Sequence, residues 1–229
     1  MDIFDYNKVF SSIDYQGRYS YKNQPNIILW NLTRFAETIL PLIDNNLNKS
    51  IKKAEEILNE FASIYESSWI SIMGQKLGIE DTKNTDKNLI EEFLDLMQNQ
   101  QLDFTNSFYS LSFLIEKDQI GKEAPSKSQQ ILSKIQSSNW YVKWRKRLNI
   151  NKKNLKKILK TLLINNPSII PRNHIVEKVL NDAIYENKKD SLNDFLNALN
   201  DPYKLRTFDD PYTKPPSPNE EVTQTFCGT

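Results

Sequence analysis

Apolar side chains recur every three or four residues along most of this chain, and this spacing constrains the fold more than any other feature. The longest example is the segment 47–77, whose apolar residues fall on one stripe: Ile51, Ala54, Ile57, Leu58, Phe61, Ile64, Tyr65, Trp69, Ile72, Met73 and Leu77. This spacing matches the 3.6-residue period of an α-helix, whereas a half-buried strand alternates every second residue. No alternating stretch of convincing length occurs. The sequence therefore predicts an all-α fold.

Three more helices are predicted around this segment, over residues 25–42, 87–99 and 103–116. Pro25 suits the first position of a helix, with Asn23 or Gln24 near the cap. We expect that helix to be buried and to bend near Pro41, because a proline inside a helix removes one hydrogen bond. Together with the segment 47–77, these helices can pack as one bundle-like body.

The second half of the chain is predicted to be helical as well. Residues 117–125 lose the helical spacing and contain Gly121 and Pro125, so we expect a boundary or connection there. The helices that we expect after it cover residues 126–136, 139–148, 153–164, 174–187 and 191–199. Residues 201–229 are rich in proline, and we expect a tail that lies across the body or is partly disordered.

The composition excludes several classes of protein. The chain has 229 residues, of which 38% are hydrophobic, so it can bury a core. Its net charge is +1, which provides no overall field to attract nucleic acid or an anionic membrane. Only five glycines are present, and no window approaches the ~18 consecutive apolar residues of a membrane span. We therefore expect a cytoplasmic protein without nucleic-acid or membrane partners.

The basic run of residues 143–160 is the one local patch that could bind phosphates. Tryptophan, tyrosine, leucine and isoleucine side chains interleave with these lysines and arginines at helical spacing. Such interleaving is typical of helices whose charged face is solvated. Binding of nucleic acid is the alternative interpretation, and we regard it as the weaker one.

Few side chains are candidates for chemistry. His174 is the only histidine and follows Pro171-Arg172-Asn173 at the start of a predicted helix. A cap or packing role is the commoner case for such a histidine, and a catalytic base is the alternative. Arg172 and Asn173 would then be hydrogen-bond donors that fix the loop. Cys227, the only cysteine, excludes an internal disulfide, and its place in the tail leaves a redox role or no role open.

The segment Gln16–Arg34 joins a polar loop to a helix in an unusually specific order of residues. Further distinctive segments follow it: Gln75-Lys76-Leu77-Gly78, Asp103–Phe108 with Leu111-Ser112, Trp144–Arg147, Asn166-Pro167, Ile170–His174 with Glu177, Pro215-Pro216 and Thr225–Thr229. In this order they resemble the selenoprotein O family (SelO, or YdiU-like proteins), which are pseudokinases that act as protein adenylyltransferases. The resemblance covers essentially the whole chain.

The resemblance implies a kinase-like helical C-lobe portion with a C-terminal helical extension, without the N-lobe. It divides the chain into the end of an activation segment, a C-lobe bundle, a connection, an extension and a Pro-rich tail: residues 1–24, 25–116, 117–125, 126–200 and 201–229. Arg18, Asn23 and Gln24 would be structural residues of the activation segment. The family activity is the transfer of AMP from ATP to Ser, Thr or Tyr hydroxyls of protein substrates, with Mg²⁺ or Mn²⁺.

The family's nucleotide-binding and metal-binding residues lie in the part that precedes this chain. Its metal-binding aspartate opens an Asp-Tyr-Gly-Pro-Phe-Gly segment, and residues 1–5 look like what comes directly after it. We therefore expect no catalytic, cofactor or metal residue here, no AMP transfer by this chain alone, and a kinase-like N-terminal half as partner. Some members pair a cysteine at the position of Cys227 with one in the activation segment, but residues 10–12 contain none. The alternative is a non-enzymatic interaction module or a decayed remnant.

Overall fold

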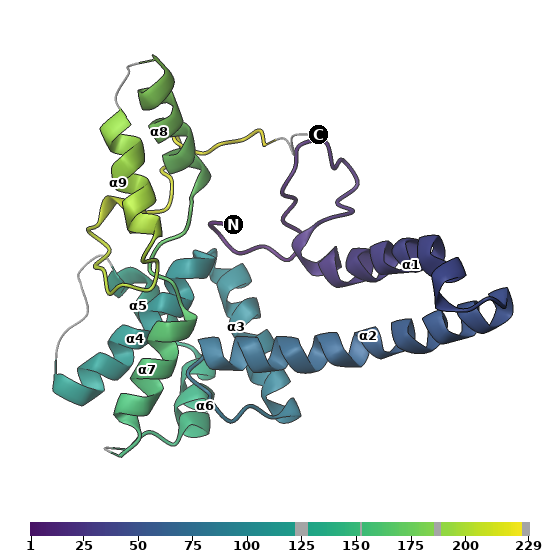
Figure 1. The fold of residues 1–229 in the computed structure, drawn as a ribbon. Helices are drawn as coiled ribbons and strands as arrows, with labels where there is room; N and C mark the ends of the chain where they lie inside the picture. Colours follow the sequence, from purple (N-terminus) through teal and green to yellow (C-terminus); the bar gives the residue numbers. More distant parts are fainter. Residues whose placement is uncertain (122–127, 152, 186–188, 226–229) are drawn as a thin grey trace. The chain divides into compact units, whose positions relative to one another are not determined.

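The computed structural model describes residues 1–121, 128–151, 153–185 and 189–225, and these residues are predominantly helical (Figure 1). The helices are α1 Gln24–Ile43, α2 Leu47–Lys76, α3 Lys87–Gln100, α4 Phe104–Ile120, α5 Gln129–Gln136, α6 Asn139–Leu148, α7 Leu155–Asn165, α8 Asn173–Tyr185 and α9 Lys189–Leu199. Within the described ranges, β pairing is limited to one bridge between Ile3 and Asp103. The predicted all-α fold is confirmed. None of the helices described has the length and apolar character of a membrane span.

Contacts divide the chain into two compact units. The larger unit comprises Met1–Phe4 and Ile72–Thr223, and the smaller comprises Asp5–Ser71 with the described residues 224–225. The expected boundary at residues 117–125 stays a prediction, because residues 122–127 lie outside those described. What the structure adds there is that α4 continues to Ile120, where Gly121 ends it with a positive φ of 70°.

Aromatic side chains of three helices form the centre of the larger unit. The ring of Phe93 on α3 stacks 4.2 Å from Trp140 on α6 and meets Phe108 on α4 edge-on at 5.0 Å. Trp144, fully buried one turn after Trp140, donates its Nε1–H to the carbonyl of Leu77 at 2.8 Å. The indole N–H of a buried tryptophan needs an acceptor. The hydrogen bond from Trp144 therefore fixes how α6 lies against the end of α2.

Helix α4 is buried along most of its length, including its small polar residues. Ser110 and Ser112 donate their hydroxyls to carbonyls three residues earlier, at 2.9 and 2.7 Å. Such local bonds satisfy hydroxyls inside an apolar environment, where an unpaired polar group would be costly. Helix α4 packs against α5 and α7, so it is the central element around which the larger unit is built.

The smaller unit contains α1 and most of α2 and corrects one prediction. Its buried hydrophobic residues, within the described ranges, are Ile27, Ala54 and Ile70. The predicted burial of residues 25–42 is therefore wrong, since Phe35 is 61% and Leu42 86% exposed. The apolar period shows that a helix has an apolar face, but it does not supply the element that would cover that face.

Residues 201–223 of the C-terminal tail lie on the larger unit. Phe208 and Thr213 are buried, and the amide of Ser168 donates to the carbonyl of Pro202 at 2.8 Å. A single 3₁₀ turn, Pro211–Thr213, is the only helical element after α9 in the described residues. The tail thereby reaches the first turn of α4, where the candidate site is found.

Candidate functional site

The side chain of Arg172 is buried just before α8 and is paired with carboxylates. Its Nη1 donates to Oδ2 of Asp103 at 2.7 Å and its Nη2 donates to Oδ1 at 3.0 Å. This two-pronged arrangement matches the planar guanidinium to the carboxylate and is stronger than a single hydrogen bond. Nη1 also donates to Asp2. One buried cation therefore holds two carboxylates that are far apart in the sequence.

Asp103 links this ion pair to the start of α4. It is the N-cap of that helix, and its side chain accepts a hydrogen bond from the amide of Asn106 at 2.7 Å. The N-terminal segment runs beside it: Phe4 N–H donates to the carbonyl of Leu102 at 2.9 Å, and Phe104 N–H donates to that of Asp2 at 2.8 Å. Arg172 therefore fastens Met1–Phe4 to the N-terminus of α4.

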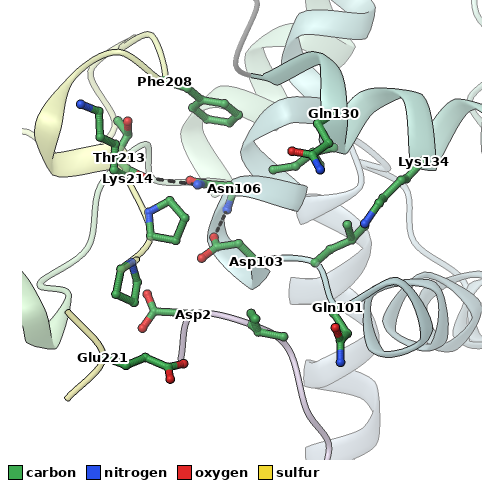
Figure 2. A pocket seen from close by; sticks show the side chains of 15 residues that line it. Asp2, Gln101, Asp103, Asn106, Gln130, Lys134, Phe208, Thr213, Lys214 and Glu221 are labelled. Atoms are coloured by element: carbon green, nitrogen blue, oxygen red, sulfur yellow. Dashed lines mark hydrogen bonds between the residues drawn. The ribbon is translucent and has the colours of Figure 1, made fainter. Parts of the chain in front are cut away.

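The tail completes the group, which we call the Arg172 cluster: Asp2, Asp103, Asn106, Arg172 and Thr213. The Nδ2 of Asn106 donates to the carbonyl of Thr213 at 3.1 Å, and Nη2 of Arg172 approaches the same carbonyl at 3.4 Å. Figure 2 shows Asp2, Asp103, Asn106 and Thr213 around a pocket of about 340 Å³, with Lys134 and Glu221 at its edge. Four separate segments of the larger unit thus meet at one arginine.

Electrostatics keep Arg172 charged. Burial alone would lower its pKa, but the hydrogen bonds and charges of Asp103 and Asp2 raise the pKa above its ordinary value. An arginine in this setting does not exchange protons in the physiological range. The cluster can therefore hold segments in place and compensate carboxylates, but it offers no acid or base at Arg172.

His174 lies in the first turn of α8, two residues after Arg172. Burial lowers its pKa, partly opposed by the charges of Asp2 and Glu220. Its Nδ1 is buried without a hydrogen-bond partner among the described residues. The ring lines a groove of about 860 Å³ together with Tyr212 and Pro215 of the tail. A neutral imidazole fits the predicted structural role, and catalysis at His174 stays a prediction.

The other predicted site residues lie elsewhere. In the smaller unit, the guanidinium of Arg18 lies 4.3 Å from the ring centre of Trp30. The backbone carbonyl of Arg18 accepts a hydrogen bond from Nδ2 of Asn23 at 2.6 Å. Gln24 is the first residue of α1, directly after Asn23. These three residues therefore shape one loop-to-helix junction. Asn173 is exposed at the start of α8.

Cys227 lies outside the described residues, so its possible redox role stays a prediction. The expectation that the chain carries no metal ligands stays one too. In the ranges that the structure describes, no group of three or more His, Cys, Asp or Glu side chains is arranged to hold a metal ion.

Lys76 is a half-buried ionisable residue that the sequence did not single out as a site. Its Nζ donates to the carbonyl of Asn165 at 3.0 Å and lies 5.2 Å from the ring centre of Phe108. Burial lowers its pKa from 10.5 to about 8. A lysine in the last turn of a helix normally indicates a solvated cation beside the helix dipole, so the sequence carried no signal of this burial.

Several cations of the basic run are paired with carboxylates. Lys143 contacts Glu92 at 2.6 Å, Arg145 contacts Asp118 at 2.6 Å, and the Nε of Arg147 lies 2.5 Å from Asp86. Asp86 is buried, so its pair with Arg147 anchors the start of α3 to α6. These cations stabilise helix packing, which weakens the interpretation of the run as a phosphate-binding patch.

Comparison with known sequences identifies the family. Residues 1–200 match the sequence model of the family described as "Protein adenylyltransferase SelO". The chain belongs to the SelO family. Among curated SelO-family relatives named "Protein nucleotidyltransferase YdiU", the protein of Alcanivorax borkumensis is 43% identical over 229 residues, and one from Clostridium botulinum is 41% identical over 233.

The match to these SelO relatives is complete for this chain but not for them. It covers 100% of the chain and 45% of the protein from either organism, and 44% of a Clostridium perfringens relative that is 39% identical. The chain thus spans less than half the length of the relatives it matches. The predicted family is confirmed, and the expected partial coverage agrees with these lengths.

Proposed function

We propose that this chain is the C-terminal helical part of a SelO-type enzyme that transfers AMP from ATP to Ser, Thr or Tyr hydroxyls of protein substrates. Family membership supports the reaction class, and the length of the relatives supports a second, kinase-like half that supplies the nucleotide site. The division of the chain into activation segment, C-lobe bundle and extension is part of this proposal. We also place the protein in the cytoplasm, without nucleic acid as a partner.

The observation that carries the proposal is the attachment of Met1–Phe4 to α4 by Arg172. By resemblance, the family's metal-binding aspartate lies directly before this segment. A metal-binding carboxylate must be held within a fraction of an ångström of its productive position, and supporting residues outside the site provide that rigidity. In the proposed enzyme Arg172 is therefore a positioning residue, which acts through the segment it fixes.

ATP and a divalent cation do not fit the residues described here as a site of their own. The Arg172 cluster has its carboxylates satisfied by a guanidinium, and the described part of the chain offers no alternative group of metal ligands. We therefore derive no step of AMP transfer through this chain's side chains. Its proposed contribution is mechanical: it supports the segment that follows the metal-binding residues.

The first test uses a hybrid in which this chain replaces the matched 45% of the Alcanivorax borkumensis relative. With labelled ATP and Mg²⁺, we expect the hybrid to transfer AMP and the chain alone to give no self-labelling. A well-folded hybrid without transfer would instead favour the non-enzymatic interaction module or the decayed remnant. Clear self-labelling by the chain alone would contradict the assignment of the nucleotide site to the other half.

The positioning role of Arg172 is tested in the same hybrid. Arg172→Met should lower kcat for AMP transfer more than tenfold at a temperature where circular dichroism shows a folded protein, with little change in the KM for ATP. Arg172→Lys keeps a cation that can reach Asp103 and should recover part of kcat. If both variants lose activity only in proportion to their unfolded fraction, Arg172 has a structural role alone.

A further inference from the structure

Helix α1 presents a continuous exposed stripe of apolar side chains. The residues are Ile28, Leu32, Phe35, Ile39 and Leu42, spaced by four, three, four and three positions, and we call them the α1 stripe. At 100° per residue they fall within a sector of about 80°. Ile28, Leu32, Phe35 and Leu42 are exposed and Ile39 is half-buried. The stripe therefore has the form of a helix face that normally packs against another element.

The smaller unit as a whole is short of a core. Large apolar side chains of α2 are also exposed, among them Ile57 at 70% and Ile64 at 57%. In the described ranges, the buried hydrophobic residues of this unit are only Ile27, Ala54 and Ile70. Soluble proteins rarely expose a contiguous apolar patch of this kind unless it is an interaction site.

The charged residues of α1 lie away from the stripe and are paired. Arg34 is paired with Glu37 at 2.7 Å, and Lys53 is paired with Asp44 at 2.8 Å. At 100° per residue, Arg34 and Glu37 lie about 120° and 180° from the centre of the stripe, so the stripe presents no cation to a polyanion such as nucleic acid or an anionic membrane surface. An apolar protein surface is the occupant that fits.

We propose that the α1 stripe is the docking surface for the half of the SelO-type enzyme that this chain does not include; this inference rests on the proposed function. More than half of each matched relative lies outside the match. In these relatives a large protein surface is therefore available within the same polypeptide as the matched part. A covalently linked partner has a high effective concentration and outcompetes a second copy of the chain. The stripe then becomes buried core between the two halves.

The test measures thiol labelling in this chain and in the hybrid with the Alcanivorax borkumensis relative, both in a Cys227→Ser background. Phe35→Cys and Leu42→Cys report on the two ends of the stripe. Val142→Cys is the matched control, because Val142 on α6 is 66% exposed and lies outside the smaller unit. Labelling rates are read at each site by peptide mass spectrometry.

We expect both stripe positions to react at least tenfold more slowly in the hybrid than in the chain alone, and position 142 to react equally in both. Equal rates at the stripe positions overturn the inference. Slow labelling of the stripe positions in the chain alone also overturns the inference. If the slow rate depends on protein concentration, a second copy of the chain covers the stripe; if it does not, the chain's own larger unit covers it. AMP transfer is measured separately: protection without transfer refutes the proposed function alone, and transfer without protection refutes the docking surface alone.

Discussion

Replacing Lys76 with methionine should change how the stability of this protein depends on pH. Burial lowers the pKa of Lys76 to about 8, against 10.5 in its ordinary state. Between these two values the unfolded chain binds more protons at this side chain than the folded chain does. The free energy of unfolding must then rise with pH, because the folded state no longer holds an unfavourable buried charge. Methionine has similar length and no charge, so this contribution should disappear.

The size of the effect follows from the two pKa values. A difference of one unit in pKa corresponds to about 1.4 kcal/mol. When the difference in bound protons between the unfolded and the folded chain is integrated from pH 7.5 to 9.5, the free energy of unfolding rises by about 2 kcal/mol as an upper bound. The ammonium is only partly buried, so screening by solvent reduces the expected gain to about 1 kcal/mol. Lys76→Met also loses the hydrogen bond to Asn165, which is worth about 1 kcal/mol at every pH.

The assay is urea unfolding of both proteins at several values between pH 7.5 and 9.5, with the free energies extrapolated to water. Lys134→Met is the matched control, because Nζ of Lys134 also donates to a backbone carbonyl, that of Gln100 at 3.1 Å, but in an exposed setting. We expect the difference between wild type and Lys76→Met to change by about 1 kcal/mol across this range. The difference for Lys134→Met should stay constant. Parallel curves for wild type and Lys76→Met would refute the buried-charge reasoning.

Three further substitutions test the packing of the larger unit, each by the urea midpoint of unfolding. Arg172→Met leaves the buried carboxylate of Asp103 unpaired and should cost about 3–5 kcal/mol, part of which Asp103→Asn in the same chain should recover. Gly78→Ala should cost about 1–2 kcal/mol, because φ is +78° and the new Cβ would lie 3.1 Å from Leu162. Trp144→Phe removes the donor to the carbonyl of Leu77 and should cost about 1–3 kcal/mol; an unchanged midpoint would show that water replaces it.

Helix prediction from the sequence was most successful where a cap or a terminating residue accompanied the apolar period. Asp103 caps α4, and Gly78 lies just after the end of α2 with a positive φ of 78°. Both signals are local, since they depend on backbone groups within one turn of the residue. Helix α4 nevertheless extends to Ile120, past the predicted end at residue 116.

The sequence indicated one segment of the candidate site but not the partners of that segment. The segment Pro171-Arg172-Asn173-His174 was distinctive, but nothing in it indicated that Arg172 pairs with Asp2 and Asp103. Ion pairs between distant segments depend on how the chain folds back, which local spacing does not encode. Lys76 shows the same limit, because its burial arises from packing against Phe108 and the carbonyl of Asn165.

The sequence by itself determined the helical class and, through its specific segments, the SelO family, because periodicity and motifs are local properties of a chain. Only the tertiary structure decided which apolar faces are covered. Helix α4 became the central element of the larger unit, whereas the apolar stripe of α1 stayed exposed. Burial requires a second surface, and an amphipathic pattern describes only one of the two.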